Sequence, residues 1–458
     1  MRPFTIEARI PGGKGRAGTI ETPHGKIQTP AFISVGTKAT VKSLTPEQVR
    51  SLDAEAILAN AYHLYLQPGT KVLKKAGGLG KFMNWSGPTF TDSGGFQAFS
   101  LGPAFGSKMG KINKGEKDKI VKLADGVTAI GKKPDTEQDL TMDTEEMAVA
   151  PAKIDDDGVT FKSIIDGSTH RFTPEHSIEI QHDIGADIIF AFDECLSPLE
   201  SYEKQKAAVE RTHRWAKRCL VRHKAGKAIE SFGRFGESDG EWESVATSPE
   251  VDGVSKKTLL FVPALFGIVQ GGRHEDLRRQ SARTIGSMDF EGFGIGGSFD
   301  KEDIGTAVGW VCEELPENKP RHLLGIGEPI DLILGIENGV DTFDCVTPTR
   351  IARNGAAYTK KISFGQVPQK IKTGRLNLTN AQFTDDFGPI EEDCGCYTCV
   401  NYTRAYIAHL FRAKEMLAAT LTSIHNLYFL VHLAKDARNA IVDGKWREFR
   451  DGQISNCQ

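Results

Sequence analysis

Carboxylates close several apolar segments of this sequence, and their positions predict acid–base or nucleophilic chemistry. Asp92 lies in "GPTFTDSGG", Asp193 and Glu194 lie at the end of "ADIIFAFDEC", and Asp344 lies in "GVDTFDCVTPTRIARNG". Two carboxylates across a pocket permit nucleophilic attack by one and proton transfer by the other. The alternative for each acid taken alone is an N-cap of the next helix.

Glycines and a few planar side chains accompany these acids and favour a flat, polar ligand. "VQGG" (269–272) and Gly296-Gly297 open the backbone to close approach. Gln270 offers both a donor and an acceptor, which suits an amide-bearing heterocycle. Phe96, in "DSGGFQAFSL" (92–101), could stack on a flat ring; the alternative is an ordinary core phenylalanine.

Two arginines flank the turn that follows Asp344. Arg350 and Arg353 lie in "TPTRIARNG", close to where a nucleophile at Asp344 would act. Arginine at such a place suits a phosphate or a base edge. Taken alone, each would be better explained as a solvated surface residue.

Cysteines cluster near the end of the chain and predict a metal site. Cys394, Cys396 and Cys399 supply three thiolates within "CGCYTC". Zinc in a structural site takes four tetrahedral sulfur or nitrogen ligands, and His409 or His425 could supply the fourth. His425 is favoured, because "LTSIHNLYFL" is an apolar helical context where ligation would satisfy the imidazole. The alternative is a set of buried or reactive thiols.

The elements that position these residues read as alternating strands and helices. Short apolar runs ending in glycine or acid recur, among them "AEAILANAYHL", "LLFVPALFGIVQGG", "FEGFGIGG" and "RHLLGIGEP", with helical stretches such as 202–223 and 274–286 between them. Strands alternating with helices imply a parallel sheet, and continuous apolar strands imply burial on both faces. Polar residues at the strand ends favour a (β/α)8 barrel. A doubly wound sheet is the alternative, although no G-x-G-x-x-G follows the first strand.

Composition divides the 458 residues into a barrel and an appended part. We expect a catalytic barrel over 1–380 and a zinc-binding helical subdomain over 381–458. Within the barrel, 103–157 is rich in lysine and acids, and 226–257 has few large apolar residues. Both segments are predicted to be solvated insertions.

Global composition limits the possible partners and compartment. Hydrophobic residues make up 39% of the chain and charged residues 26%, which is typical of a soluble globular protein. With a net charge of -3, any nucleic-acid site must be a local basic patch. There is no apolar leader, so a cytoplasmic location is expected. Eight cysteines in a chain of this length do not make a disulfide scaffold.

Taken together, these motifs closely resemble the tRNA-guanine transglycosylase family, also called queuine tRNA-ribosyltransferase. The matching segments run from about residue 5 to about residue 450 and are "DSGGFQAFSL", "FDEC", "GIVQGG", "GIGG", "LLGIGEP", "DTFDCVTPTRIARNG" and "CGCYTC" with His425. The resemblance implies a zinc-containing (β/α)8 barrel that exchanges guanine 34 of tRNAs with a G-U-N anticodon (Asp, Asn, His and Tyr) for a 7-deazaguanine. It also implies a homodimer that binds one tRNA at a time.

The resemblance assigns roles to residues of this sequence. Asp344 would be the nucleophile that attacks C1′ of the ribose and leaves a covalent enzyme–tRNA intermediate, and Asp92 would be the general acid/base. Both roles agree with the chemistry expected of paired carboxylates at a sugar. The residues implied to surround the base are Ser93, Phe96, Asp193, Cys195, Gln270, Gly296, Gly297, Glu302 and Leu324.

The resemblance also implies the RNA-contacting segments and the metal ligands. The tRNA contacts would come from Gly325, Ile326, Gly327, Glu328, Pro329, Ile330, Asp331, Thr349, Arg350, Ile351, Ala352 and Arg353. The zinc ligands would be Cys394, Cys396, Cys399 and His425, a closed set with a structural role. No redox or nucleotide cofactor is expected.

Cys195 and Glu302 resemble the bacterial branch, whose substrate is preQ1 (7-aminomethyl-7-deazaguanine). "GGSFDKED" (296–303) stands where that branch usually has "GGLAVGE", so Ser298, Phe299 and Asp300 reshape the pocket floor. A member that inserts queuine or preQ0 is therefore the alternative. Two further alternatives are a non-catalytic tRNA-binding subunit, which has no need of both Asp92 and Asp344, and a zinc hydrolase, which needs an open metal position.

Overall fold

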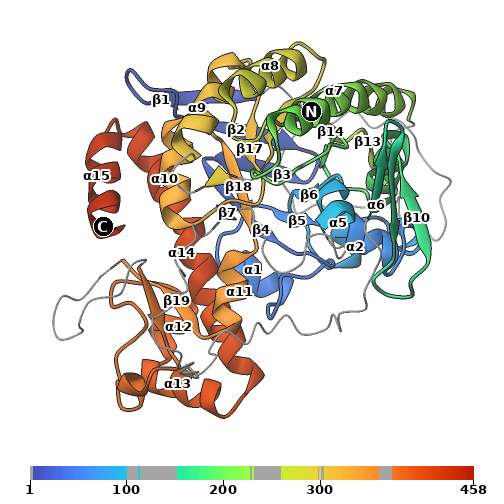
Figure 1. Ribbon diagram of the computed structural model, residues 1–458. Helices are drawn as coiled ribbons and strands as arrows, with labels where there is room; N and C mark the ends of the chain where they lie inside the picture. The colour runs from blue at the N-terminus through green and yellow to red at the C-terminus, as the bar shows by residue number, and fades with distance from the viewer. Residues whose placement is uncertain are drawn as a thin grey trace, which may run out of the picture.

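Eight parallel strands form a closed barrel in the computed structural model, as predicted from the apolar runs (Figure 1). The structure describes residues 4–100, 112–113, 152–226, 229–231, 259–297, 299–300, 304–360 and 374–457. The barrel strands are β4 (Ala31–Val35), β5 (Ile57–Ala59), β6 (Thr89–Thr91), β11 (Ile188–Phe190), β14 (Ala264–Val269), β15 (Gly292–Ile295), β17 (Arg321–Leu323) and β18 (Thr342–Cys345).

Pairing of the first and last barrel strands closes the ring. Thr342 of β18 pairs with Ala31 of β4, and β6 pairs with β11 through Phe90 and Ile188, all in parallel. Every residue of these eight strands is buried, which explains their continuous apolar character. In a barrel of this kind the loops at the carboxyl ends of the strands build the active site.

Helices cover the outside of the barrel (Figure 1). Those between successive barrel strands are α1 (Pro46–Ser51), α2 (Ala61–Leu66), α3 (Thr70–Ala76), α4 (Leu79–Phe82), α5 (Gly95–Ser100), α6 (Pro174–Ile184), α7 (Tyr202–Ala225), α8 (Glu275–Gly286), α9 (Ile304–Glu314) and α10 (Pro329–Glu337). The helices predicted over 202–223 and 274–286 are α7 and α8. Local signals set their limits: the Ser201 side chain caps α7, and Thr173 caps α6, which ends at a left-handed Gly185.

A small antiparallel sheet closes the amino-terminal end of the barrel. It consists of β1 (Thr5–Arg9), β2 (Arg16–Thr22) and β3 (Gly25–Thr29), and its Ile20 and Ile27 pack with the barrel interior. The buried Arg16 guanidinium donates to both carboxylate oxygens of Asp341, which directly precedes β18, at 2.9 and 2.7 Å. Breaking a buried pair of this kind costs about 3–5 kcal/mol, so this end of the barrel is structural.

The predicted insertions lie mostly outside the described residues. Of 103–157, the structure describes β7 (Ile112–Asn113) and 152–157, which opens a sheet of β8 (Lys153–Asp155), β9 (Gly158–Lys162) and β10 (Thr169–Phe172). Of 226–257, it describes residue 226 and β12 (Ile229–Ser231), which pairs with β13 (Leu259–Phe261). β7 also pairs in parallel with β16 (Phe299–Asp300), so the first insertion reaches the "GGSFDKED" segment.

The carboxyl-terminal part joins the barrel through one long helix. After β18 come α11 (Thr347–Arg353), β19 (Ala356–Tyr358), β20 (Arg375–Asn377), a 3-10 helix (Ala381–Phe383), α12 (Tyr397–Asn401), α13 (Arg404–Arg412), α14 (Met416–Val442) and α15 (Trp446–Cys457). Ala418 and Leu421 of α14 pack with the cysteine-bearing cluster, whereas Leu430 and Ala434 belong to the main barrel core. The helix therefore serves both parts.

The same helix has the length and apolar character of a membrane span. Its mean hydropathy over the most apolar window is 1.3, and it is the one such helix in the part of the chain that the structure describes. Within the protein, 67% of that window is buried, as is typical of a core helix.

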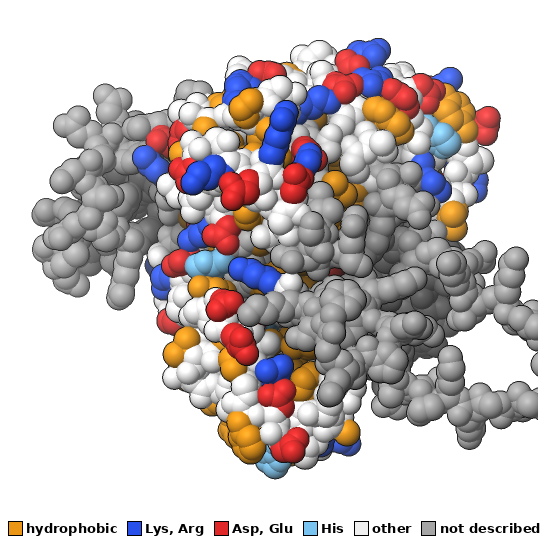
Figure 2. All heavy atoms as spheres, turned by 90° about the vertical axis from the view of Figure 1, so that its left-hand side faces the viewer, with side chains coloured by type: hydrophobic (Ala, Val, Ile, Leu, Met, Phe, Trp, Pro, Cys, Tyr) orange, Lys and Arg blue, Asp and Glu red, His pale blue; other side chains and the backbone are white. Residues whose placement is uncertain are grey.

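Charged side chains of both signs intermingle on the face that carries β1 and α15 (Figure 2). Ion pairs of these elements include Arg9 with Glu317 at 3.0 Å and Arg450 with Asp451 at 2.8 Å. Exposed pairs of this kind stabilise a fold by about 0–1 kcal/mol each. The described part of this face offers no extended single-sign patch for a polyanion.

A buried histidine–aspartate contact at the base of the barrel predicts a pH-dependent stability. His24 Nδ1 lies 2.6 Å from Asp187 Oδ1, directly before β11. Burial lowers the pKa of His24, but the hydrogen bond and charge of Asp187 outweigh it and leave that pKa raised above 6.5. A raised folded-state pKa gives stability that is complete below about pH 6.5 and is lost as pH rises through the folded-state value.

We expect the difference in unfolding free energy between the native chain and His24→Asn to be larger at about pH 5.5 than at about pH 9. Urea unfolding monitored by circular dichroism at both values measures it. If the difference in unfolding free energy is equal at the two pH values, or larger at the higher one, the His24–Asp187 contact does not stabilise the fold in this way.

Candidate active site and metal centre

A pocket with an empty volume of about 390 Å³ opens among the carboxyl ends of the barrel strands. Its walls come from loops after β6, β11, β14, β15 and β17 and from two barrel side chains. The lining residues are Asp92, Ser93, Phe96, Gln97, Phe190, Asp193, Cys195, Ile268, Gln270, Gly296, Gly297 and Leu324. Eight of the nine residues expected around a base are therefore brought together.

Hydrogen-bond donors surround the Asp92 carboxylate, which follows β6. Asn60 Nδ2 and Gln97 Nε2 both donate to Oδ2, the latter at 2.8 Å. The backbone N–H groups of Ala61, at 2.8 Å, and Gly94, at 3.2 Å, donate to Oδ1. Four donors therefore fix the orientation of both oxygens of the Asp92 carboxylate.

A short hydrogen-bonded chain crosses one wall of the pocket. Ser93 Oγ donates to Asp193 Oδ1 at 3.1 Å, and Gln270 Nε2 donates to Asp193 Oδ2 at 2.6 Å. All three residues are buried. The two hydrogen bonds fix the orientation of the Asp193 carboxylate and of the Gln270 amide. The oxygen atoms of both groups can accept hydrogen bonds from the polar edge of a ligand.

The glycines of this wall make room for neighbouring side chains. A Cβ atom at Gly296 would lie 2.6 Å from Gln270 Nε2. At Gly297, whose φ is +109°, a Cβ would lie 2.4 Å from Arg278 Nη2. The sequence interpretation assigned these glycines to close ligand approach; the structure adds that Gln270 and Arg278 require them.

Arg278 of α8 supports this wall from behind. It is fully buried, and its guanidinium donates to the carbonyl oxygens of Gly296 at 2.6 Å, Gly272 at 2.9 Å and Val269 at 3.3 Å. Burial lowers the pKa of Arg278 to about 9. The arginine thus fixes the ends of β14 and β15, on which Gln270 and Gly297 depend.

Asp344 ends β18 and is held by two donors from the neighbouring strand β17 and its loop. Its Oδ1 lies 3.1 Å from His322 Nε2 and accepts a hydrogen bond from the Gly325 N–H at 2.7 Å. Gly325 follows Leu324, which lines the pocket, so Asp344 sits next to the pocket edge. His322 is completely buried.

Glu194, next to Asp193, takes no part in the pocket lining. Its Oε2 accepts from Arg211 Nη1 of α7 at 2.5 Å. Burial raises the pKa of Glu194, and the Arg211 charge opposes that effect. Of these two adjacent acids, Asp193 faces the pocket and Glu194 faces α7.

Several supporting residues were not predicted from the sequence. Asn60, Gln97 and His322 hold the two key carboxylates, while Phe190 and Ile268 line the pocket. Asn60 and His322 stand at or near the ends of apolar runs, as Asp92 and Asp344 do, and that signal could have drawn attention to them.

The segments expected to contact tRNA flank Asp344, but many of their side chains are buried. Ile326, Gly327, Glu328 and Asp331, around the start of α10, and Thr349 and Ala352, in α11, are buried; Gly325, Pro329, Ile330, Ile351 and Arg353 are partly exposed, and Arg350 is exposed. Arg353 Nη1 donates to the Thr349 carbonyl at 2.9 Å. Glu302, expected to contact the base, lies outside the described residues, as does Ser298.

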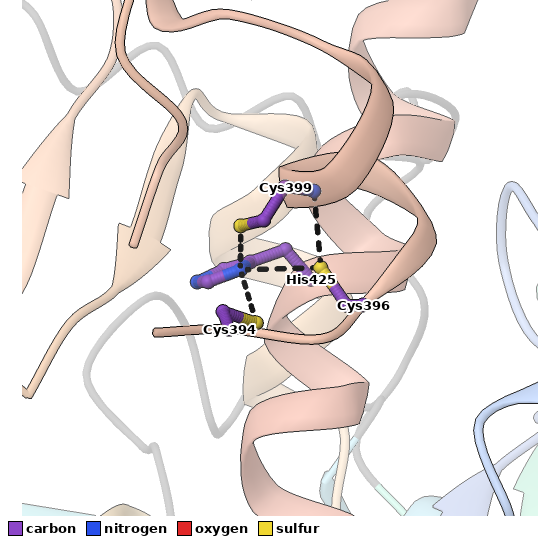
Figure 3. Close-up of side chains that lie close together, drawn as sticks. All are labelled: Cys394, Cys396, Cys399 and His425. Atoms are coloured by element: carbon purple, nitrogen blue, oxygen red, sulfur yellow. Dashed lines mark hydrogen bonds between the residues drawn. The ribbon is translucent and has the colours of Figure 1, made fainter. Parts of the chain in front are cut away.

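Three cysteines and one histidine converge in the carboxyl-terminal part (Figure 3). His425 Nδ1 lies 3.7 Å from Cys394 Sγ, 3.6 Å from Cys396 Sγ and 3.3 Å from Cys399 Sγ. All four potential ligand atoms lie within 4.8 Å of one another, so they can share one metal ion. The predicted choice of His425 over His409 agrees with this geometry.

The second ring nitrogen of His425 and the neighbouring Asn426 connect this centre to the segment that follows β18. His425 Nε2 lies 2.8 Å from the Tyr358 carbonyl of β19, which fixes Nδ1 as the ligand atom. The buried Asn426 accepts from the Tyr358 N–H at 2.9 Å and donates to the carbonyls of Ala356, at 2.9 Å, and Pro348, at 3.0 Å. Pro348 lies in the first turn of α11, four residues beyond Asp344.

Comparisons with known proteins agree with the resemblance seen in the sequence. The sequence model of the family described as queuine tRNA-ribosyltransferase matches residues 12–126 and 110–458, and its two matches meet inside the predicted first insertion. A queuine tRNA-ribosyltransferase of Pelotomaculum thermopropionicum is 41% identical over 458 residues, covering 99% of this chain and 98% of the relative. One from Roseiflexus sp. (strain RS-1) is 42% identical over 450 residues, with 98% of each chain covered.

A third relative of the same name, from Fusobacterium nucleatum, is 39% identical over 461 residues and covers 100% of this chain and 99% of its own. These matches extend over nearly the full length of both partners. The chain therefore belongs to the queuine tRNA-ribosyltransferase family.

Proposed function

We propose that this protein exchanges guanine 34 in tRNAs with a G-U-N anticodon for preQ1, through a covalent Asp344–ribose intermediate. The observation that carries the proposal is that Asp92 lines one pocket with Asp193 and Gln270, while Asp344 accepts from the N–H of Gly325, the neighbour of the pocket residue Leu324. Family membership supports the reaction type.

The reaction proceeds in two displacements at C1′ of ribose 34. The Asp344 carboxylate forms a bond to C1′ while the C1′–N9 bond breaks, and its electron pair leaves with guanine, which receives a proton from Asp92. The incoming base then attacks C1′ through N9, its proton passes to Asp92, and the Asp344 ester bond breaks. Protons balance over the cycle, and two inversions retain the configuration, as in retaining glycosidases.

Asp92 must therefore hold a proton in one half of the cycle. Gln97 is suited to both halves, because an amide offers a donor and an acceptor. Its Nε2 now donates to Asp92, while its buried Oε1 has no hydrogen-bond partner within the described structure. Rotation of the amide would turn Oε1 towards a protonated Asp92.

The pocket wall provides recognition of the base. The Asp193 carboxylate accepts from ring N–H and amino groups on the Watson–Crick edge, Gln270 and the Gly297 N–H bind the carbonyl, and Phe96 stacks on the ring. Cys195 and Leu324 shape the remaining surface. Glu302 is proposed to bind the aminomethyl group of preQ1.

We further propose that the loop at 325–331 and α11 at 349–353 bind the anticodon arm. Arg350 is the exposed cation nearest in sequence to Asp344 in this region and would meet a backbone phosphate. Because base exchange requires guanine to leave the anticodon stack, these contacts would hold the flipped nucleotide at the pocket. The working unit is proposed to be a cytoplasmic homodimer.

Zinc is the metal we propose for the Cys394–Cys396–Cys399–His425 site. Tetrahedral zinc with sulfur at about 2.3 Å and nitrogen at about 2.05 Å requires sulfur–nitrogen separations of about 3.6 Å. The three observed separations, 3.3–3.7 Å, fit this value. With four protein ligands the ion would hold the fold and leave the chemistry to the carboxylates.

The nucleophile assignment predicts that Asp344→Asn abolishes exchange. The amide keeps the volume of the side chain but lacks the nucleophilic charge, so incorporation of labelled guanine into tRNA should fall by about a thousandfold or more. The matched control is Glu194→Gln, which retains an acceptor for Arg211 and should keep most activity. Normal exchange by Asp344→Asn, with native metal content, would overturn the assignment.

The choice of base is tested by competition. A tRNA with a G-U-N anticodon is offered equal amounts of preQ1, queuine and preQ0, and the modified nucleoside is identified by mass spectrometry. We expect preQ1 alone to enter. Insertion of queuine or preQ0 in place of preQ1 would show that the protein uses a different base.

The zinc proposal predicts about one zinc ion per chain in the purified protein, measured by inductively coupled plasma mass spectrometry. Cys396→Ser should lose most of the metal and unfold at a lower temperature. Cys312→Ala, a change at a buried thiol of the main core, should keep it. Full metal content in Cys396→Ser, or a metal other than zinc, contradicts the proposal.

A further inference from the structure

His322 lies inside the barrel with both ring nitrogens in contact. Nε2 lies 3.1 Å from Asp344 Oδ1, and Nδ1 lies 2.9 Å from the Thr342 hydroxyl. The Phe90 and Phe190 rings lie 5.6 and 5.2 Å away, centroid to centroid. A carboxylate can only accept, so the contact with Asp344 requires a proton on Nε2, while the Thr342 hydroxyl can donate to or accept from Nδ1.

A hydrogen-bond donor that contacts Asp344 binds the free carboxylate and the ribosyl ester with different strengths. Hydrogen bonds to ionised acceptors are roughly twice as strong as those to neutral ones. When the Asp344 carboxylate bonds to C1′, its charge disappears, and Oδ1 becomes a weaker acceptor whichever of the two oxygens carries the ribose. The His322 N–H therefore binds the free carboxylate better than the covalent adduct.

We propose that His322 is a positioning residue that stabilises free Asp344 relative to its ribosyl ester and so promotes the second displacement. The inference rests on the proposed function above. In that displacement N9 of the incoming base bonds to C1′, the C1′–O bond breaks, and its electron pair returns to the carboxylate. The returning charge meets the His322 and Gly325 N–H groups, which are already aimed at Oδ1.

The first half-reaction supplies a direct measurement, since free guanine reverses it. Enzyme and tRNA form adduct and release guanine, so added guanine lowers the adduct fraction seen on a denaturing gel. In His322→Leu the adduct should persist to a guanine concentration about tenfold higher than in the native enzyme, which is the fold-change expected from losing a charge-assisted hydrogen bond. His322→Gln, whose amide can donate from the Nε2 position, should restore most of the native value.

Two further variants separate positioning from loss of structure. Thr342→Val removes the hydroxyl that holds His322 Nδ1. The guanine concentration at the midpoint of adduct loss should shift in the same direction as in His322→Leu, but by a smaller factor. This variant also tests the inference if His322→Leu does not fold. Cys312→Ala, a change at a buried thiol of α9, should leave the midpoint native. Partial unfolding lowers the total adduct but does not move the midpoint, so the readout is specific.

The outcomes distinguish this inference from the function on which it rests. If the native enzyme forms no adduct at any guanine concentration, the covalent pathway itself is wrong. If the native enzyme forms adduct and the midpoints of folded His322→Leu and Thr342→Val match the native one, the role of His322 is wrong. A lower midpoint in these variants also overturns it, because it would mean that His322 favours the ester.

Discussion

A buried carboxylate loses its hydration and needs hydrogen-bond donors from the protein in its place. This requirement accounts for the arrangement of side chains at both ends of the barrel. At the amino-terminal end, Asp341 is paired with the Arg16 guanidinium and Asp187 with His24. These pairs bind the capping sheet to the starts of β18 and β11, which Asp341 and Asp187 directly precede. The negative charges of both aspartates are balanced by a cationic or protonated partner, and the two pairs stabilise the fold.

At the carboxyl-terminal end the donors are amides, a hydroxyl, an imidazole and backbone N–H groups. They orient Asp92, Asp193 and Asp344 while leaving negative charge available to a ligand or to a reacting carbon. The metal centre extends the same framework. His425 and Asn426 bind β19 and the first turn of α11, so the start of α11, a few residues from Asp344, and the strand that follows this helix are both held in place.

The sequence carried enough information for the barrel, the rim carboxylates and the metal ligands. Strands buried on both faces leave continuous apolar runs, and short spacing brings Cys394, Cys396 and Cys399 together without knowledge of the rest of the fold. Supporting contacts were harder to foresee, because they join distant segments: Asn60 reaches Asp92 across 32 positions and His322 reaches Asp344 across 22. Asp193 and Glu194 are chemically alike, and only the path of the backbone after β11 decides which of them faces the pocket. The double role of α14 likewise depends on packing between parts of the chain that its own sequence does not specify.

The central claim is that Asp344 bonds to the ribose, and peptide mapping of the trapped adduct tests it most directly. The enzyme is incubated with tRNA, quenched in acid, and digested with nuclease and protease, and the fragments are analysed by tandem mass spectrometry. The account predicts a ribose-containing mass addition on the peptide that spans β18 and α11, localised to Asp344. An addition on Asp92 or Asp193, or a steady-state reaction that proceeds with no adduct on any peptide, would contradict it.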